Sequence, residues 1–134
     1  MLDKRIYQNY IGILKEEMIP AMGCTEPIAL AYGAARAREV LGKEPEHITA
    51  KCSGNIIKNV RCVIIPNSGG LTGIEAGVVL GAVAGNASLN MEVLSNVNEF
   101  ERKRCRELLD KKICNVELLD SPVVLHFIIE MQAG

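Results

Sequence analysis

The sequence predicts an α+β protein in which helices pack against a small sheet. Hydrophobic residues make up 49% of the 134 residues but aromatic residues only 4%, so the core must be aliphatic and closely packed. Apolar residues recur at helical spacing in several segments and alternate in others. Turns rich in glycine or proline separate these segments. The length fits one domain over residues 1–134.

Two helices are predicted in the first third of the chain. The first covers residues 3–20, where an apolar stripe recurs every three or four positions and Pro20 ends it. The second covers residues 25–41, because Thr25 suits an N-cap and Gly42 suits a C-terminal cap. The stripe of the first helix comprises Ile6, Tyr10, Ile13, Leu14 and Met18.

The middle of the chain predicts a strand followed by two helices. Residues 48–53 alternate apolar and polar, which indicates a strand. Residues 56–60 fit a short helix or a strand, and we favour the helix. A glycine-rich turn then opens a helix over residues 74–84, which Gly85 and the following Asn86 end.

The last third predicts a helix and two strands. The charged amphipathic pattern of residues 98–112 indicates a helix, and its run 101–104 is predicted to be a solvated face. Residues 116–119 and 123–131 are predicted strands, joined at the Asp-Ser-Pro sequence 120–122. The helix is expected to bury Phe100, Leu108 and Leu109.

Composition argues against several classes of protein. A net charge of -1 gives no electrostatic reason to expect nucleic acid or an anionic membrane as a partner. No run approaches the roughly 18 apolar residues that a membrane span needs, and the N-terminus lacks an apolar signal core. The five cysteines show no Cys-x-x-Cys pair and form a poor disulfide framework. We therefore expect a cytoplasmic protein.

Cys24 is the first candidate for chemistry, in the sequence Gly-Cys-Thr-Glu-Pro of residues 23–27. A thiol just before a helix N-terminus meets the positive end of the helix dipole, which favours the thiolate. A thiolate can bind a metal or an iron–sulfur cluster, or act as a nucleophile. The alternative is an ordinary buried cysteine.

The glycine-rich sequence of residues 66–73 is the second candidate. Ser68, Gly69, Gly70 and Gly73 precede an apolar helix, so successive backbone N–H groups and the helix N-terminus can form an anion site. A small carboxylate fits better than a triphosphate, because no Lys or Arg flanks the loop in the sequence. The alternative is a turn that merely lets the helix pack tightly.

A weaker candidate lies at the end of the predicted strand 48–53. Ser53, Asn55 and Lys58 are positioned to bind polar groups of a ligand there, although a turn with local hydrogen bonds explains them equally simply. His47 is expected to be exposed in a polar connection, and His126 to be structural.

Three segments resemble one enzyme family when they are taken together. Residues 17–31, 53–60 and 66–76 are similar, in the same order, to the opening blocks of the cysteine desulfidases, which are related to iron–sulfur L-serine dehydratases. This resemblance implies β-elimination of L-cysteine to pyruvate, ammonia and sulfide, with a [4Fe–4S] cluster. L-Serine is the alternative substrate.

The resemblance also implies roles for individual residues. Cys24 would be a cluster ligand, and Glu26 and Lys58 are the candidates for the base that removes the α-proton. The substrate would be held by Thr25, Ser53, Asn55, Ser68, Gly69, Gly70 and Gly73.

The chain resembles only the N-terminal part of such an enzyme, so the sheet is expected to be incomplete relative to the full-length family. Either the remaining cluster ligands would come from a C-terminal half on a second chain, or the chain is a truncated piece of such an enzyme. In both cases this chain alone would be inactive. A homodimer is also expected to be compatible with an open sheet edge. The alternatives are a non-catalytic amino-acid-binding subunit and an assembly subunit.

Overall fold

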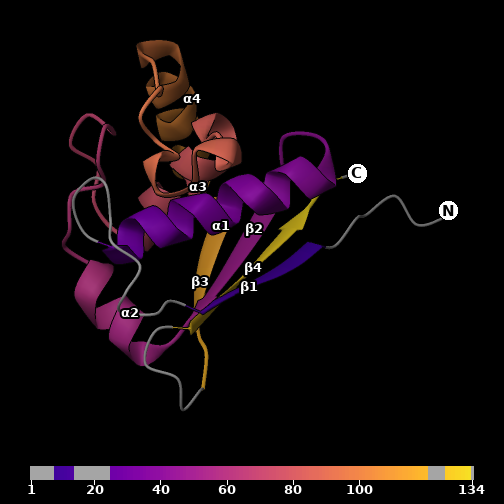
Figure 1. Ribbon diagram of the computed structural model, residues 1–134, viewed down its shortest axis with the longest axis vertical. Helices are drawn as coiled ribbons and strands as arrows, with labels where there is room; N and C mark the ends of the chain where they lie inside the picture. Colours follow the sequence, from indigo (N-terminus) through magenta and orange to yellow (C-terminus); the bar gives the residue numbers. More distant parts are fainter. Residues whose placement is uncertain (1–7, 14–24, 121–125, 134) are drawn as a thin grey trace, which may run out of the picture.

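The computed structural model describes residues 8–13, 25–120 and 126–133, which form a layer of helices on one face of a four-stranded sheet (Figure 1). Helix α1 crosses the strands, α3 and α4 lie on the same side of the sheet, and α2 follows the end of β2. This arrangement confirms the predicted α+β class. The elements in chain order are β1 (Gln8–Ile13), α1 (Thr25–Leu41), β2 (His47–Cys52), α2 (Gly54–Val60), α3 (Ile74–Ala84), the 3₁₀-helix η1 (Ala87–Glu92), α4 (Glu99–Asp110), β3 (Cys114–Leu118) and β4 (His126–Gln132).

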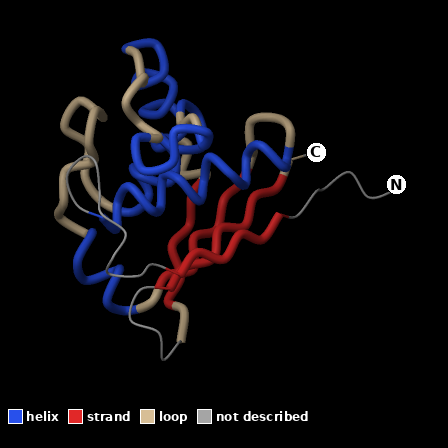
Figure 2. The backbone as a smooth tube through the Cα atoms, in the orientation of Figure 1, coloured by secondary structure: helices blue, strands red, loops and turns tan. Residues whose placement is uncertain are grey.

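The strand order is β1-β4-β2-β3, so the sheet is mixed (Figure 2). Strand β4 is antiparallel to both β1 and β2, whereas β2 and β3 are parallel, with Ile48 opposite Cys114. The two predicted C-terminal strands both exist as β3 and β4. They are not neighbours, because β2 lies between them.

The core lies between the sheet and the helices. Strands β2 and β4 alternate buried and half-buried side chains, as expected for a sheet with one covered face. Their registers place the buried side chains of both strands on the same face, which α1 covers. These side chains are Ile48, Ala50, Cys52, Phe127, Ile129 and Met131.

Helices α1 and α3 pack at unusually close range because small residues face each other. A Cβ added at Gly81 would lie 2.3 Å from the Ala31 carbonyl oxygen, and one at Gly85 would lie 2.9 Å from Ala35 Cβ. A Cβ at Gly77 would lie 3.7 Å from the oxygen of Pro27. The contacts advance by four residues on both helices in the same direction, so the helices are parallel and their N-terminal turns lie at the same end.

The predicted helix over residues 3–20 is wrong where the structure describes it, because Gln8–Ile13 forms strand β1. The segment contains Tyr10, Ile11 and Ile13, which favour strands, and Gly12, which weakens helices. All six residues pair with β4, an interaction that the local helical pattern could not reveal. The other residues of that prediction lie outside the described part of the chain.

The remaining helix predictions are confirmed. Helix α1 ends at Gly42, whose φ of 85° and N–H bond to the Arg38 carbonyl (2.9 Å) form the expected glycine cap. The favoured helical form of residues 56–60 is confirmed by α2, and α3 covers the predicted residues. Helix α4 begins with a capping box between Asn98 and Glu101.

Two details of the α4 prediction are wrong. Phe100 is 79% exposed, while Leu108 is buried as expected and Leu109 is half-buried. Phe100 precedes the buried Cys105 by five positions, which places it about 140° around the helix axis, on the solvent side. The charged run 101–104 is only partly solvated, because the side chain of Arg102 is 19% exposed.

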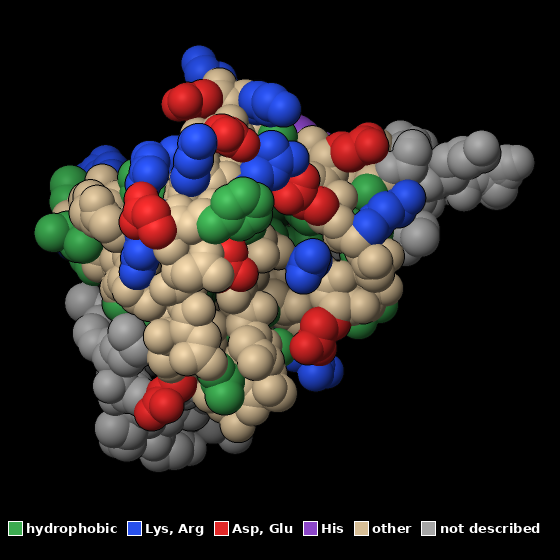
Figure 3. All heavy atoms as spheres, turned by 90° about the horizontal axis from the view of Figure 1, so that it is seen from above, with side chains coloured by type: hydrophobic (Ala, Val, Ile, Leu, Met, Phe, Trp, Pro, Cys, Tyr) green, Lys and Arg blue, Asp and Glu red, His purple; other side chains and the backbone are tan. Residues whose placement is uncertain are grey.

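The surface carries both signs of charge in close alternation (Figure 3). Helix α4 contributes much of this pattern, since Arg104 pairs with Glu44 at 2.6 Å and with Glu107 at 3.1 Å. Within the described ranges, no helix is both long and apolar enough to cross a membrane.

Candidate functional site

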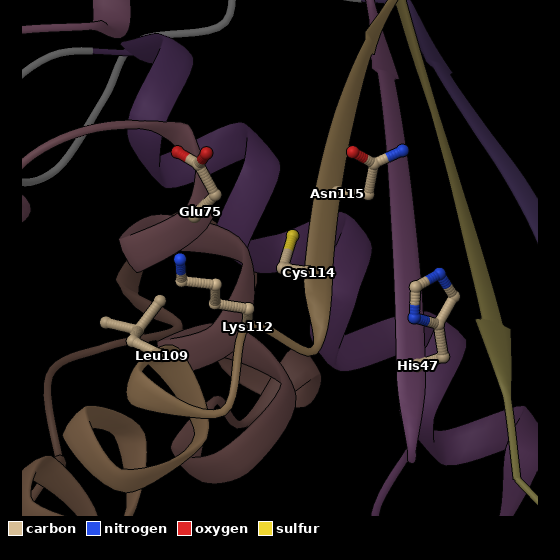
Figure 4. A pocket seen from close by; sticks show the side chains of 6 residues that line it. All are labelled: His47, Glu75, Leu109, Lys112, Cys114 and Asn115. Atoms are coloured by element: carbon tan, nitrogen blue, oxygen red, sulfur yellow. The ribbon is translucent and has the colours of Figure 1, made fainter.

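A pocket of about 540 Å³ lies between the edge strand β3 and the helices α3 and α4 (Figure 4). Its volume falls in the usual range for small-molecule sites. Unlike the aliphatic core, it is lined mainly by polar and ionisable side chains. These are His47, Glu75, Leu109, Lys112, Cys114 and Asn115.

Two oppositely charged residues face this pocket from different helices. Glu75 lies in the first turn of α3, where a carboxylate is favoured by the helix dipole. Lys112 follows the end of α4 with a φ of 57°, in the left-handed position that glycine usually occupies. Figure 4 shows the Lys112 ammonium extending toward the side of the pocket where the Glu75 carboxylate lies.

Backbone hydrogen bonds fix the turn at Lys112. Its N–H group donates to the Leu109 carbonyl at 3.0 Å, and the Ile113 N–H donates to the Leu108 carbonyl at 3.4 Å. These bonds end α4 and turn the chain into β3. A non-glycine residue in this conformation costs about 1 kcal/mol, which is tolerated where the surrounding structure fixes the turn.

Strand β3 supplies a thiol and an amide to the same pocket. Figure 4 shows the Cys114 sulfur between β3 and Lys112, and the Asn115 amide on the other side of the strand. The Asn115 amide donates to the Glu117 carboxylate at 3.1 Å. Burial, and to a smaller extent the negative charge of Glu75, raise the pKa of Cys114 to about 12. Cys114 is therefore a neutral thiol at pH 7, with a weak S–H donor.

A second, smaller pocket of about 190 Å³ adjoins the first. Glu75 lines both pockets, which places them on either side of the first turn of α3. The smaller pocket is formed by the end of α2, the start of α3 and the middle of β3. Its lining residues are Ile57, Arg61, Gly73, Ile74, Glu75 and Val116.

The glycine loop predicted to bind a carboxylate is divided between two environments. The hydroxyl of Ser68 is buried, donates to the Ile65 carbonyl at 2.7 Å and accepts from the Leu71 N–H at 2.9 Å. Gly69 and Gly70 are exposed, with φ values of 79° and 98°. Ser68 thus closes the loop on itself.

Gly73, the last residue of this loop, is buried with a φ of 95° and lines the smaller pocket. The other three predicted loop residues, Ser68, Gly69 and Gly70, line neither pocket.

Arginines of α4 flank this loop, contrary to the prediction from the sequence. Arg102 donates to the Asn67 carbonyl at 2.9 Å and to the Asn67 side-chain oxygen at 2.6 Å. A Cβ at Gly69 would lie 3.5 Å from Arg102 Cδ and 3.8 Å from an Arg106 nitrogen. The prediction failed because these residues are more than thirty positions away in the sequence.

The weaker candidate at the end of β2 lies apart from both pockets. Ser53 is buried, and its N–H donates to the His126 carbonyl at 2.9 Å. Asn55 and Lys58 are exposed on α2 and line neither pocket. Their predicted roles in binding and proton transfer stay predictions.

The first candidate lies largely beyond the described residues. Cys24 itself is outside them, and so are the side chains of Thr25 and Glu26, although their backbone begins α1. The described residues contain no group of three or more His, Cys, Asp or Glu side chains that could hold a metal ion. The cluster that the resemblance implies, with Cys24 as its expected ligand, stays a prediction.

The other described cysteines differ in exposure. Burial raises the pKa of both Cys52 and Cys105 to about 12, so their thiols are protonated at neutral pH. Cys62 is exposed at the end of α2.

Most of the pocket residues have no local signal in the sequence that marks them as part of a site. His47 is exposed as expected, but its position beside the pocket depends on the pairing of β2 with β3. Lys112 offered one clue, because the predicted helix ended there without a glycine.

The chain is similar to proteins named UPF0597 from several bacteria. It is 47% identical over 125 residues to one from Treponema denticola, a match that covers 93% of this chain and 29% of that protein. It is 47% identical over 127 residues to one from Desulfitobacterium hafniense, covering 95% and 30%, and 52% identical over 111 residues to one from Finegoldia magna, covering 83% and 27%. The chain thus spans about 30% of the length of these relatives.

No protein-family model matches the chain, and no solved structure matches it.

These comparisons correct the family resemblance inferred from the sequence. The relatives carry the name UPF0597 protein, and the identification as part of a cysteine desulfidase is wrong. The matches cover 83% to 95% of this chain and 27% to 30% of each of these three UPF0597 proteins.

Proposed function

We propose that this chain binds a small α-amino acid in the larger pocket, as the recognition part of a lyase that eliminates the β-substituent of L-cysteine. The observation that carries the proposal is the pair of opposite charges, Glu75 and Lys112, that line one pocket. An α-amino acid is a zwitterion, so its ammonium and carboxylate groups need opposite partners at short range.

The charges of the pocket support this assignment. None of the ion pairs found between described residues involves Glu75 or Lys112. Glu75 can accept hydrogen bonds from the substrate ammonium, and Lys112 can donate to its carboxylate.

The reaction follows from the chemistry of such a substrate. A base removes the α-proton, the Cβ–S bond breaks, and hydrogen sulfide leaves after taking up a proton. The resulting aminoacrylate becomes an imine, and water hydrolyses it to pyruvate and ammonia. Glu26 and Lys58 remain the candidates for the base. L-Serine would follow the same course with water as the leaving group.

The predicted [4Fe–4S] cluster has no complete ligand set among the described residues, and it remains a proposal. The predicted second chain and the homodimer likewise remain proposals. The second chain matters for the proposed lyase activity, because this chain spans only about 30% of its relatives' length.

Calorimetric titration with L-alanine tests the binding site, because L-alanine has no leaving group and cannot be consumed. We expect Glu75→Gln and Lys112→Met each to weaken binding about tenfold or more, since each removes a charge-assisted hydrogen bond. Lys111→Met is the matched control: Lys111 is exposed, adjacent to Lys112 and absent from the pocket lining. Equal losses in Lys111→Met and Lys112→Met would refute the assignment.

The lyase part of the proposal is tested separately. Sulfide release from L-cysteine and pyruvate release from L-serine are measured without oxygen, and both should fall in Glu75→Gln. If the chain binds L-alanine but releases neither sulfide nor pyruvate, the lyase activity is refuted and only the amino-acid-binding function stands.

A further inference from the structure

The smaller pocket continues the proposed amino-acid site along strand β3. Cys114 lines the larger pocket and Val116 the smaller one, and both face the helix side opposite Ile48 and Ala50 of β2. Two same-face residues of a strand are about 6.6 Å apart. Because Glu75 lines both pockets, a ligand that it holds can extend from one pocket into the other.

The two pockets differ in chemical character. Ile57, Ile74 and Val116 give the smaller pocket apolar walls, and Arg61 adds one cation. Glu75, at the boundary, is the partner proposed for the substrate ammonium. The smaller pocket therefore suits an apolar stem that ends in an anionic group.

The spacing along β3 exceeds the reach of the cysteine side chain. A group bound near Glu75 must cross about 6.6 Å to reach the level of Val116, which requires an extended stem of about five or six bonds. The single methylene and sulfur of L-cysteine would leave the smaller pocket unfilled.

We infer that the substrate of this site is an L-cysteine whose sulfur carries a short substituent with a terminal carboxylate. This inference rests on the proposed amino-acid site and adds the substrate class. The head group binds between Glu75 and Lys112, the S-substituent passes over Val116, and its carboxylate binds Arg61. In the elimination, the Cβ–S bond breaks and the leaving group is the substituted thiolate, which takes up a proton. The aminoacrylate and its hydrolysis are unchanged.

The inference is tested by comparing the affinities of three ligands, each titrated calorimetrically into the whole chain. The ligands are L-alanine, S-methyl-L-cysteine and S-carboxymethyl-L-cysteine. We expect S-carboxymethyl-L-cysteine to bind about tenfold or more tightly than the other two. Arg61→Met should reduce its affinity to about that of S-methyl-L-cysteine. Arg38→Met is the control, because Arg38 is an exposed arginine on α1 that lines neither pocket.

Val116→Phe provides a second variant, which fills the smaller pocket without changing charge. It should weaken the binding of both S-substituted ligands more than the binding of L-alanine. Thermal unfolding of each variant verifies that it is folded at the titration temperature.

The outcomes separate the two proposals. Equal affinity of the wild-type chain for all three ligands, or a proportional loss for all three in Arg61→Met, would overturn the inference alone. Failure of every α-amino acid to bind, or binding that Glu75→Gln does not weaken, would overturn the proposed function itself.

Discussion

The packing of α1 against α3 makes a quantitative prediction about Gly81. An ideal Cβ at this position would lie 2.3 Å from the Ala31 carbonyl oxygen and 2.6 Å from Ala31 Cα, whereas ordinary contacts lie at 3.4–4 Å. Both obstructing atoms belong to the backbone of α1, so no rotamer change can relieve them. Gly81→Ala therefore forces the two helices apart by about 1 Å.

The expected cost follows from two opposing effects. Overpacking in a tight core costs about 1–3 kcal/mol, and a backbone obstruction belongs at the upper end of that range. Alanine in place of glycine inside a helix contributes about 1 kcal/mol in the opposite direction. We expect a net loss of about 2 kcal/mol in the free energy of unfolding, which lowers the Tm by about 8 °C for a chain of this size.

Gly77→Ala is the matched control on the same helix, one turn earlier. Its Cβ would meet the flexible end of Ile65 at 3.3 Å and the Pro27 oxygen at 3.7 Å. The free energy of unfolding of this variant should therefore be within about 1 kcal/mol of the wild-type value. Urea denaturation measures both free energies. If Gly81→Ala unfolds at the same urea concentration as wild type, the close parallel packing of α1 and α3 is refuted.

Three further predictions concern charge, loop structure and thiols. The hydrogen bond from Arg104 holds the pKa of Glu44 below its usual value, so this pair stabilises the fold above about pH 4.5 and is lost as the pH falls through the lowered pKa. Glu44→Gln should flatten the pH dependence of unfolding below about pH 4.5, while an unchanged profile would contradict that role. Arg102→Lys cannot reproduce the forked contact with Asn67. We expect faster amide hydrogen exchange in residues 66–73 and a loss of about 1–2 kcal/mol in the free energy of unfolding. Unchanged exchange would contradict the role of Arg102 in holding the loop. With iodoacetamide at pH 7.5, mass spectrometry should find Cys62 alkylated before Cys105, and the reverse order would contradict the burial of Cys105.

The helices of the fold could be predicted where local signals agree with the tertiary structure. The glycine at position 42 and the capping box at Asn98 mark helix ends through their own hydrogen bonds, and the sequence contains both signals. β1 could not be predicted, because its spacing of apolar residues also fits a helix and its pairing partner β4 lies more than a hundred residues later.

The candidate site was predicted less completely than the fold. Gly73 was identified from its loop and lies in the smaller pocket, but Glu75, Lys112 and Arg61 were not identified. These residues meet only because β3 pairs in parallel with β2 and brings the end of α4 beside the start of α3. A single sequence contains no signal for contacts at that separation.

The central claim is that one pocket recognises both charges of an α-amino acid, and titration with half-charged analogues tests it most directly. The whole chain is titrated with L-alanine, with propionate, which lacks the ammonium group, and with ethylamine, which lacks the carboxylate. We expect L-alanine to bind at least about tenfold more tightly than either analogue, because each analogue leaves Glu75 or Lys112 without its partner. Propionate or ethylamine binding as tightly as L-alanine would contradict the claim.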